Sequence, residues 1–237
     1  MYSYYKAKYA RRKGGTVNFF LIIATFFLCI CLFVGIFWWN GRSTETVSLP
    51  QKYYFVVREC ESTTASAVAG EVYLSGGAGY LYEVNGTSNV VLASYFTQTS
   101  AESVCRTLQE KGTEASVMTV APREFVLRGS RTAFASQIAA NAATLDSCAH
   151  LLYDTANGLE RAERSQDEAR AAVRGVVSAL SGLCEQNSDE FFTQWNLQLK
   201  AAVKKGKEIA EGILFAKDVR YMQVQLCIAI AQSYEYF

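Results

Sequence analysis

One apolar run near the N-terminus constrains this chain more than any other feature. Residues 17–39 read VNFFLIIATFFLCICLFVGIFWW and contain no charged side chain. At about 1.5 Å per residue, a helix of this length spans the hydrocarbon core of a bilayer. The run therefore predicts a transmembrane helix, and the polypeptide that follows it must fold on one side of a membrane.

Basic residues are distributed unequally around this run. Five lysines and arginines lie within residues 1–16, whereas Arg42 and Lys52 are the basic residues that follow the run closely. Because cytoplasmic flanks carry the excess of positive charge, we expect a cytoplasmic tail at 1–16, a signal anchor at 17–39 and the rest of the chain outside the cytoplasm, at the cell membrane. A cleaved signal peptide is the alternative, but the run is too long for one and no small-residue cleavage site follows it.

Charge and motif content exclude several classes of function. The formal net charge of the 237 residues is +1, which does not suit a nucleic-acid binder. The five cysteines after the apolar run lack CxxC spacing, so the sequence predicts neither a zinc site nor a disulfide framework. His150 is the single histidine, and there is no GxSxG motif. We therefore predict no enzyme, catalytic residue, metal or cofactor, although a pair of carboxylates brought together by the fold stays an alternative.

Short elements alternate between Pro50 and Pro122, after a polar linker at 40–50. Asn85 and Gly86 are typical of a tight hairpin turn. Composition and periodicity predict strands at 53–60, 80–84, 89–96 and 115–122 and helices at 62–74 and 99–112. The order strand, helix, strand, strand, helix, strand predicts a four-stranded split β-α-β domain of the α+β class over residues 51–124.

Residues 53–121 resemble a SPOR domain. The resemblance rests on the aromatic-led first strand YYFVV and on VVLASYFTQTSAESVCRTLQEKGTEASVM, in which a strand ending in an aromatic residue leads through a polar turn to an Ala-Glu helix, and LQEKG precedes the last strand. SPOR domains occur in bacterial division and sporulation proteins, where they bind septal peptidoglycan without stem peptides. The resemblance implies a signal-anchored envelope protein that contacts glycan strands.

The outward positions of the first and third strands depart from the SPOR pattern. Where that family commonly carries Gln or Arg, this chain has Val56, Val90 and Leu92. Alternation along the first strand assigns Phe55 and Val57 to the side of the two helices, and Val56 to the other face. Because a sheet that is apolar on both faces is normally covered on both, we expect the C-terminal region to cover the face that carries Val56.

Four residues are candidates for glycan contact. Tyr80 and Tyr82 alternate along one strand and should project to one face, which Tyr54 and Arg58 of the first strand are expected to share. Tyrosine rings stack on sugars, and tyrosine hydroxyls and arginine donors bind hydroxyl or acetamido groups. The alternative is that these tyrosines pack against the C-terminal helices.

After about residue 131, apolar residues recur at the spacing of a helix. We expect residues 125–237 to contain three or four helices that pack on the sheet or form a bundle, with a first break at Asp154–Gly158, DTANG. The apolar stripe from Phe134 to Leu152 is also close to a heptad, so a coiled-coil dimer is the alternative.

Two functional hypotheses follow. In the first, the protein is a non-enzymatic envelope protein whose SPOR-like domain contacts peptidoglycan in cell division or sporulation. In the second, it is a membrane-anchored assembly scaffold, in which the helical tail covers the groove of a degenerate SPOR-like domain and envelope or division proteins are the partners. Neither function requires a cofactor, a metal or a nucleic acid.

Overall fold

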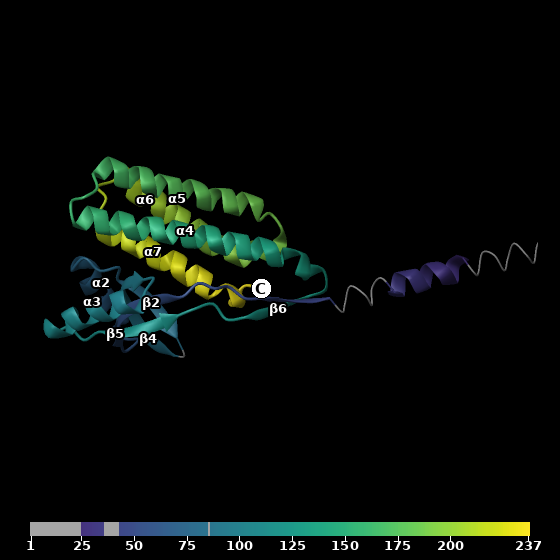
Figure 1. Ribbon diagram of the computed structural model, residues 1–237, viewed down its shortest axis with the longest axis horizontal. Helices are drawn as coiled ribbons and strands as arrows, with labels where there is room; N and C mark the ends of the chain where they lie inside the picture. Colours follow the sequence, from purple (N-terminus) through teal and green to yellow (C-terminus); the bar gives the residue numbers. More distant parts are fainter. Residues whose placement is uncertain (1–24, 36–42, 85) are drawn as a thin grey trace, which may run out of the picture. The chain divides into compact units, whose positions relative to one another are not determined.

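The structure, a computed structural model, describes residues 25–35, 43–84 and 86–237 (Figure 1). The predicted cytoplasmic tail at 1–16 and much of the predicted span at 17–39 lie outside these ranges. Residues 25–35 are helical. Within the described ranges, no helix has both the length and the hydropathy needed to cross a bilayer.

The chain forms two compact units. The first contains the residues up to Glu45 together with Val126–Ala133, and the second contains Thr46–Phe125 and Phe134–Phe237. Strands β1 (Thr44–Val47) and β6 (Phe125–Arg128) pair in a two-stranded sheet. The sequence predicted a linker at 40–50, so strand β1 is a feature that the sequence analysis missed.

A four-stranded antiparallel sheet lies in the second unit, with the strand order β3-β4-β2-β5. Its strands are β2 (Tyr53–Cys60), β3 (Tyr80–Val84), β4 (Thr87–Tyr95) and β5 (Ser116–Val120). Helix α2 (Ala65–Leu74) connects β2 to β3, and α3 (Gln98–Glu110) connects β4 to β5. The predicted order of strands and helices is confirmed, and this order is the split β-α-β arrangement.

Four helices follow in the second unit. They are α4 (Ala135–Glu160), α5 (Gln166–Gln186), α6 (Thr193–Glu211) and α7 (Ala216–Ala231). Each packs against two others, α4 on α5, α5 on α6, α6 on α7 and α7 on α4, so they close into a four-helix bundle. The stripe of α4 that resembled a heptad is buried inside this bundle, as the complete burial of Ile138, Leu145 and Leu152 shows. The bundle therefore accounts for that stripe without a second chain.

The predicted break at Asp154–Gly158 is wrong, because α4 continues to Glu160. Gly158 instead allows Arg164 to pack closely against α4, since a Cβ on Gly158 would lie 3.0 Å from Cβ of Arg164. The chain turns after α4, where Ala162 has a φ of 57°. Ser165 then begins α5 with a capping box, in which its side chain accepts from the Glu168 amide and the Glu168 carboxylate accepts from the Ser165 amide.

Helix α7 belongs to the bundle and to the sheet. It packs on α4 with one side and on β3 and β4 with the other. In Figure 1 it is drawn in yellow between α4 and the sheet. The expectation that the C-terminal region packs on the sheet or forms a bundle is confirmed in both forms.

The two faces of the sheet are covered by different helices, but in the reverse of the predicted assignment. Val56 packs against Ala101 and Cys105 of α3, so the face that carries Val56 is covered by the helices of the split β-α-β domain. The opposite face, which carries Tyr53 and Phe55, meets α4 and α7. The assignment failed because both faces are apolar, so alternation separates the two sets of residues but gives no sign of which helices each set meets.

Candidate functional site

One face of the sheet is closed by specific contacts with the bundle, and we call it the covered face. It is formed by Tyr53, Phe55, Val57, Tyr80, Tyr82, Val91 and Ser94. The hydroxyl of Tyr53 donates to Oδ1 of Asp146 in α4 over 2.9 Å. The hydroxyl of Ser94 donates to Sγ of Cys227 in α7 over 3.5 Å, and Nε2 of Gln223 donates to the Ser94 carbonyl over 3.2 Å.

Burial on this face is complete at its centre. Tyr53 and Phe55 are 0% exposed, and burial raises the pKa of the Tyr53 hydroxyl. Cys227 is also fully buried, which raises its thiol pKa to about 12. A buried thiol that stays protonated is a weak nucleophile, so Cys227 is a packing residue of the covered face.

Arg220 joins α7 to two other parts of the second unit. Its Nη1 donates to the Gly76 carbonyl over 3.2 Å and to Glu160 over 3.3 Å, and its Nη2 donates to the other oxygen of the same carboxylate. In addition, the hydroxyl of Tyr73 in α2 donates to Asp218 of α7. The start of α7 is therefore fastened to the end of α2 and to the end of α4.

The four predicted glycan residues do not share one face, so that expectation is wrong. Tyr80 and Tyr82 lie on the covered face, where Tyr80 meets Tyr221 of α7 with ring centroids 5.0 Å apart and Tyr82 meets Phe55 at 6.1 Å. Tyr54 packs with the Val56 cluster, and Arg58 forms an ion pair with Glu71 of α2. Tyr54 and Arg58 therefore lie on the opposite face of the sheet.

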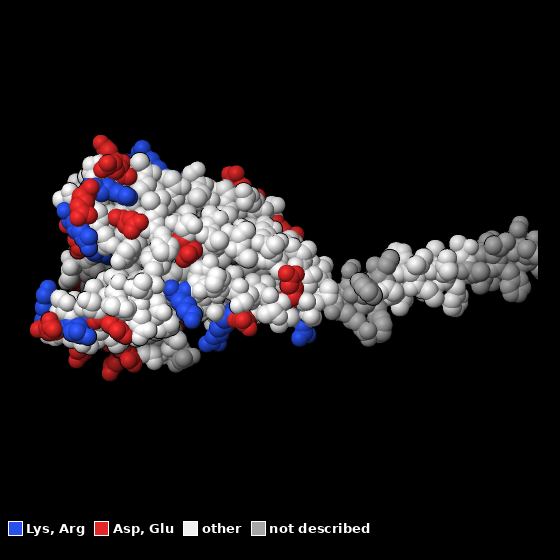
Figure 2. Space-filling view, viewed as in Figure 1, with Lys and Arg blue, Asp and Glu red and all other residues white. Residues whose placement is uncertain are grey.

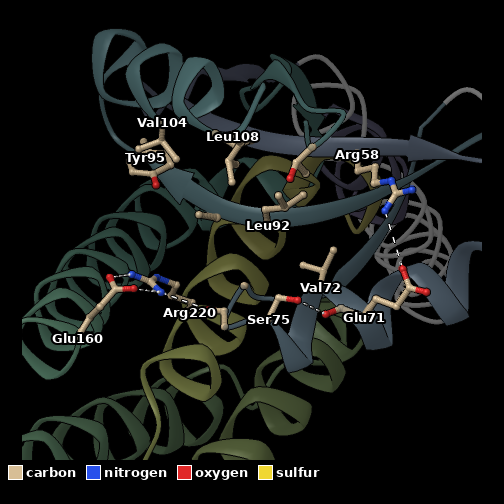
Figure 3. A pocket seen from close by; sticks show the side chains of 15 residues that line it. Arg58, Glu71, Val72, Ser75, Leu92, Tyr95, Val104, Leu108, Glu160 and Arg220 are labelled. Carbon is tan, nitrogen blue, oxygen red and sulfur yellow. Dashed lines mark hydrogen bonds and ion pairs between the residues drawn. The ribbon is translucent and has the colours of Figure 1, made fainter. Parts of the chain in front are cut away.

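That opposite face contains an open pocket of about 480 Å³, and we call it the pocket face. Strands β2 and β4 form the floor of the pocket, while α2 and the loop after it form one wall and α3 forms the other (Figure 3). The floor includes Val56, Leu92 and Tyr95, and aliphatic side chains of the two helices line the walls. A volume of this size lies in the range of small-molecule sites.

A bulge in the sheet shapes the floor. The pairing of β2 with β4 shifts between Val56 and Val57, which face Ala93 and Val91, so Leu92 is the extra residue. Leu92 and Ala93 consequently both line the pocket. The bulge gives the pocket an apolar centre with a half-buried leucine.

Glycines in the loop after α2 shape one wall. Gly76 has a φ of 96°, which favours glycine, and a Cβ at Gly77 would lie 2.7 Å from Val72. The Gly77 amide donates to the Val72 carbonyl over 3.0 Å, and the Ala78 amide donates to Leu92 over 2.7 Å. This loop, SGGAG in the sequence, therefore ends the helix and holds the wall against the floor.

Each end of the pocket carries an Arg-Glu pair, but the two pairs differ. In Figure 3, Arg58 and Glu71 lie at one end, and Arg220 and Glu160 lie at the other. The Arg220 side chain is 16% exposed and its Glu160 pair is bidentate, whereas Arg58 is 35% exposed and lies 3.9 Å from a Glu71 carboxylate that is 70% exposed. The Arg220 guanidinium is therefore held by a bidentate ion pair, and the Arg58 end holds a loosely paired guanidinium.

Tyr95 lines the pocket at the Arg220 end. Its ring meets Tyr153 of α4 edge to face at 6.0 Å. Burial raises the pKa of its hydroxyl to about 12, against the lowering effect of Arg220. The hydroxyl is consequently protonated at neutral pH and can donate a hydrogen bond.

Only some of the residues that line this pocket are recognisable in the sequence. Arg58 was a candidate residue from the sequence. Tyr95 and Arg220 were not candidates, because nothing in the local pattern around either residue indicates a site. Arg220 reaches the pocket only because α7 lies beside a loop that is 144 residues earlier in the chain.

A metal site and a nucleic-acid surface have less support in the structure. Among the described residues, no three His, Cys, Asp or Glu side chains gather in a way that could hold a metal ion. His150 stacks on Phe96 with ring centroids 3.5 Å apart and lies 3.9 Å from Asp146. On the face seen in Figure 2, acidic and basic side chains are interspersed, so the visible surface carries no extended basic region for a nucleic acid.

No family model, no curated protein and no solved structure matches this chain. The resemblance to a SPOR domain therefore stays a prediction that rests on the residues quoted for it.

Proposed function

We propose that the protein is a non-enzymatic assembly scaffold of the bacterial cell envelope, held at the membrane by a helix within residues 17–39 and acting in division or sporulation. In this proposal the split β-α-β domain is a degenerate SPOR-like module. Its partners are other envelope or division proteins, and its folded units lie outside the cytoplasm.

The observation that carries this proposal is the closure of the covered face by α7. Tyr80 and Tyr82, two of the four glycan candidates, are packed under this helix or against Phe55. Hydrogen bonds from Ser94 and Gln223 and the Arg220 contacts fix α7 in this position. A glycan strand could reach that face only after these contacts had broken, which favours a scaffold over a glycan reader.

Direct contact with peptidoglycan is the second candidate function. It keeps some support because Tyr54, Arg58, Tyr80 and Tyr82 are each only partly buried. A glycan could meet Tyr80 and Tyr82 along the edge strand β3 without entering the covered face, and it could meet Tyr54 and Arg58 from the opposite face. The two functions differ in whether substitution of the tyrosines abolishes targeting.

Localisation of a fluorescent fusion in growing and sporulating cells tests both functions. We expect the full chain to gather at the septum, and a Tyr80→Ala, Tyr82→Ala double variant of equal abundance to gather there as well. Loss of septal signal in the double variant, together with loss of sedimentation on purified glycan, would replace the scaffold with the glycan function. An even distribution of the unsubstituted fusion around the membrane would contradict both.

A further inference from the structure

Two polar groups that line the pocket are not used by the fold. Neither the guanidinium of Arg58 nor the hydroxyl of Tyr95 makes a hydrogen bond to another described residue, and the ionic contact of Arg58 with Glu71 is long, at 3.9 Å. The guanidinium of Arg220, by contrast, makes three hydrogen bonds. The Arg58 side chain is 35% exposed and only loosely paired, so its guanidinium can form an ion pair with a group from outside the chain.

The backbone spacing between these two residues indicates the length of the pocket floor. Tyr95 pairs with Tyr54, and Arg58 lies four residues further along β2, which at 3.3 Å per residue is about 13 Å. The floor between them is apolar, with Val56 and Leu92, and Val72 lies between the two ends in Figure 3. A complementary molecule is therefore elongated, with an apolar middle and a polar end group.

Charge at the Arg58 end restricts that end group. A planar guanidinium matches a carboxylate, with which it can form two parallel hydrogen bonds. Glu71 lies beside it, so a group with two negative charges would meet repulsion that a single carboxylate largely avoids. A sugar suits the centre of the pocket less, because its hydroxyls would lose water there and find aliphatic side chains.

We propose that the pocket between α2 and α3 binds an extended apolar molecule with a terminal carboxylate, and that Arg58 holds the carboxylate. A free medium-chain carboxylic acid and the C-terminal residues of a peptide share this chemistry. The inference does not depend on the scaffold function, because the pocket and the covered face lie on opposite sides of the sheet.

Titration of the full chain in lipid nanodiscs tests this proposal. Octanoate is the first probe, methyl resonances of Leu92 and Val104 report binding by NMR, and empty nanodiscs give the correction for partition into lipid. We expect saturable shifts of both methyl groups with octanoate. Octanamide, which has the same chain without the charge, should bind at least tenfold more weakly.

Substitutions at the Arg58 end give results of opposite sign. Arg58→Gln should weaken octanoate binding at least tenfold, whereas Glu71→Gln should tighten it several-fold, because it removes a negative charge and frees the guanidinium. Arg106→Gln on the exposed side of α3 is the matched control and should change nothing. Val104→Trp, which fills the pocket from α3, should abolish binding, and thermal unfolding curves check that each variant folds.

A second titration, with a peptide, distinguishes the two sources of the carboxylate. Tighter binding of glycyl-leucyl-leucine than of octanoate, lost on amidation of its C-terminus, identifies a peptide end, and the reverse order identifies a free acid. Either result supports the proposal. It is overturned if neither acid gives saturable shifts, if octanamide binds as well as octanoate, if Arg58→Gln binds like the unsubstituted chain, or if chitotriose is the one probe that binds. Septal localisation is measured separately, so failure here leaves the scaffold test intact.

Discussion

The two faces of the four-stranded sheet come from the same strands and are both rich in apolar residues, but they are covered in different ways. The covered face meets α4 and α7 through hydrogen bonds that start from Tyr53 and Ser94, and its centre is fully buried. The pocket face is covered by α2 and α3, which leave a cavity of about 480 Å³ between them. Apolar character alone therefore does not decide which face of a sheet is available to a ligand.

Truncation of one large side chain on each face should give the largest difference between them. Phe55→Ala on the covered face should lower the free energy of unfolding by about 3 to 5 kcal/mol, because it opens a cavity in a closed core. Leu92→Ala on the pocket floor should cost less, about 1 to 2 kcal/mol, because its side chain is only partly buried beside an open pocket. Urea unfolding followed by circular dichroism measures both. Equal losses would mean that the pocket is closed in solution.

Alkaline pH provides a second comparison, because burial raises the pKa of Tyr80 and of Tyr95 to about 12. Their pKa in the unfolded chain is about 10. Above pH 10 the unfolded chain therefore releases protons that the folded chain retains, and stability falls as the pH rises to 12. Each of the variants Tyr80→Phe and Tyr95→Phe should lose about 1 to 2 kcal/mol less over this range than the unsubstituted chain.

Unfolding free energies measured from pH 9 to pH 12 test this expectation, with Tyr54→Phe as the variant to compare. A protective effect of Tyr80→Phe without one of Tyr95→Phe would show that water fills the pocket around the Tyr95 hydroxyl. The reverse result would show that α7 leaves the covered face before the chain unfolds.

Removal of a single hydroxyl from each face should give the smallest difference. Tyr53→Phe deletes the hydrogen bond to Asp146 and should cost about 1 kcal/mol at pH 7. Tyr95→Phe deletes a hydroxyl that makes no hydrogen bond to another described residue, so its effect should stay within about 0.5 kcal/mol. Chemical unfolding at neutral pH measures both variants. A cost of 1 kcal/mol or more for Tyr95→Phe would reveal a partner that fills the pocket in the purified protein.

Local pattern was sufficient to predict most elements of the second unit. The strands at 53–60 and 80–84 have the predicted bounds, and the helices of the C-terminal region exist as expected. Local pattern failed where contacts between distant segments determine the secondary structure. Gly158 looked like a helix end but accommodates Arg164, and β1 in the predicted linker is a strand because β6 pairs with it.

The candidate site was predictable only in part. Arg58 was identified as a hydrogen-bond donor expected to share one face with Tyr54, Tyr80 and Tyr82, but the two tyrosines of β3 lie on the opposite face. The pocket itself depends on the bulge at Leu92 and on a gap between α2 and α3, and neither is encoded in a periodic pattern. The contacts that hold Arg220, and that leave Arg58 as the more loosely paired cation of the pocket, involve residues from α4, α7 and the loop after α2.

The position of α7 late in the chain has a consequence for biogenesis. Ser94 and its partner Cys227 are separated by 133 residues, so a ribosome completes the sheet long before it makes the helix that closes it. During that interval a newly made sheet presents Phe55 and its neighbours to whatever surrounds it. Contacts between such distant segments also form slowly. A holding chaperone or an early partner would therefore shield nascent chains until the last helix arrives.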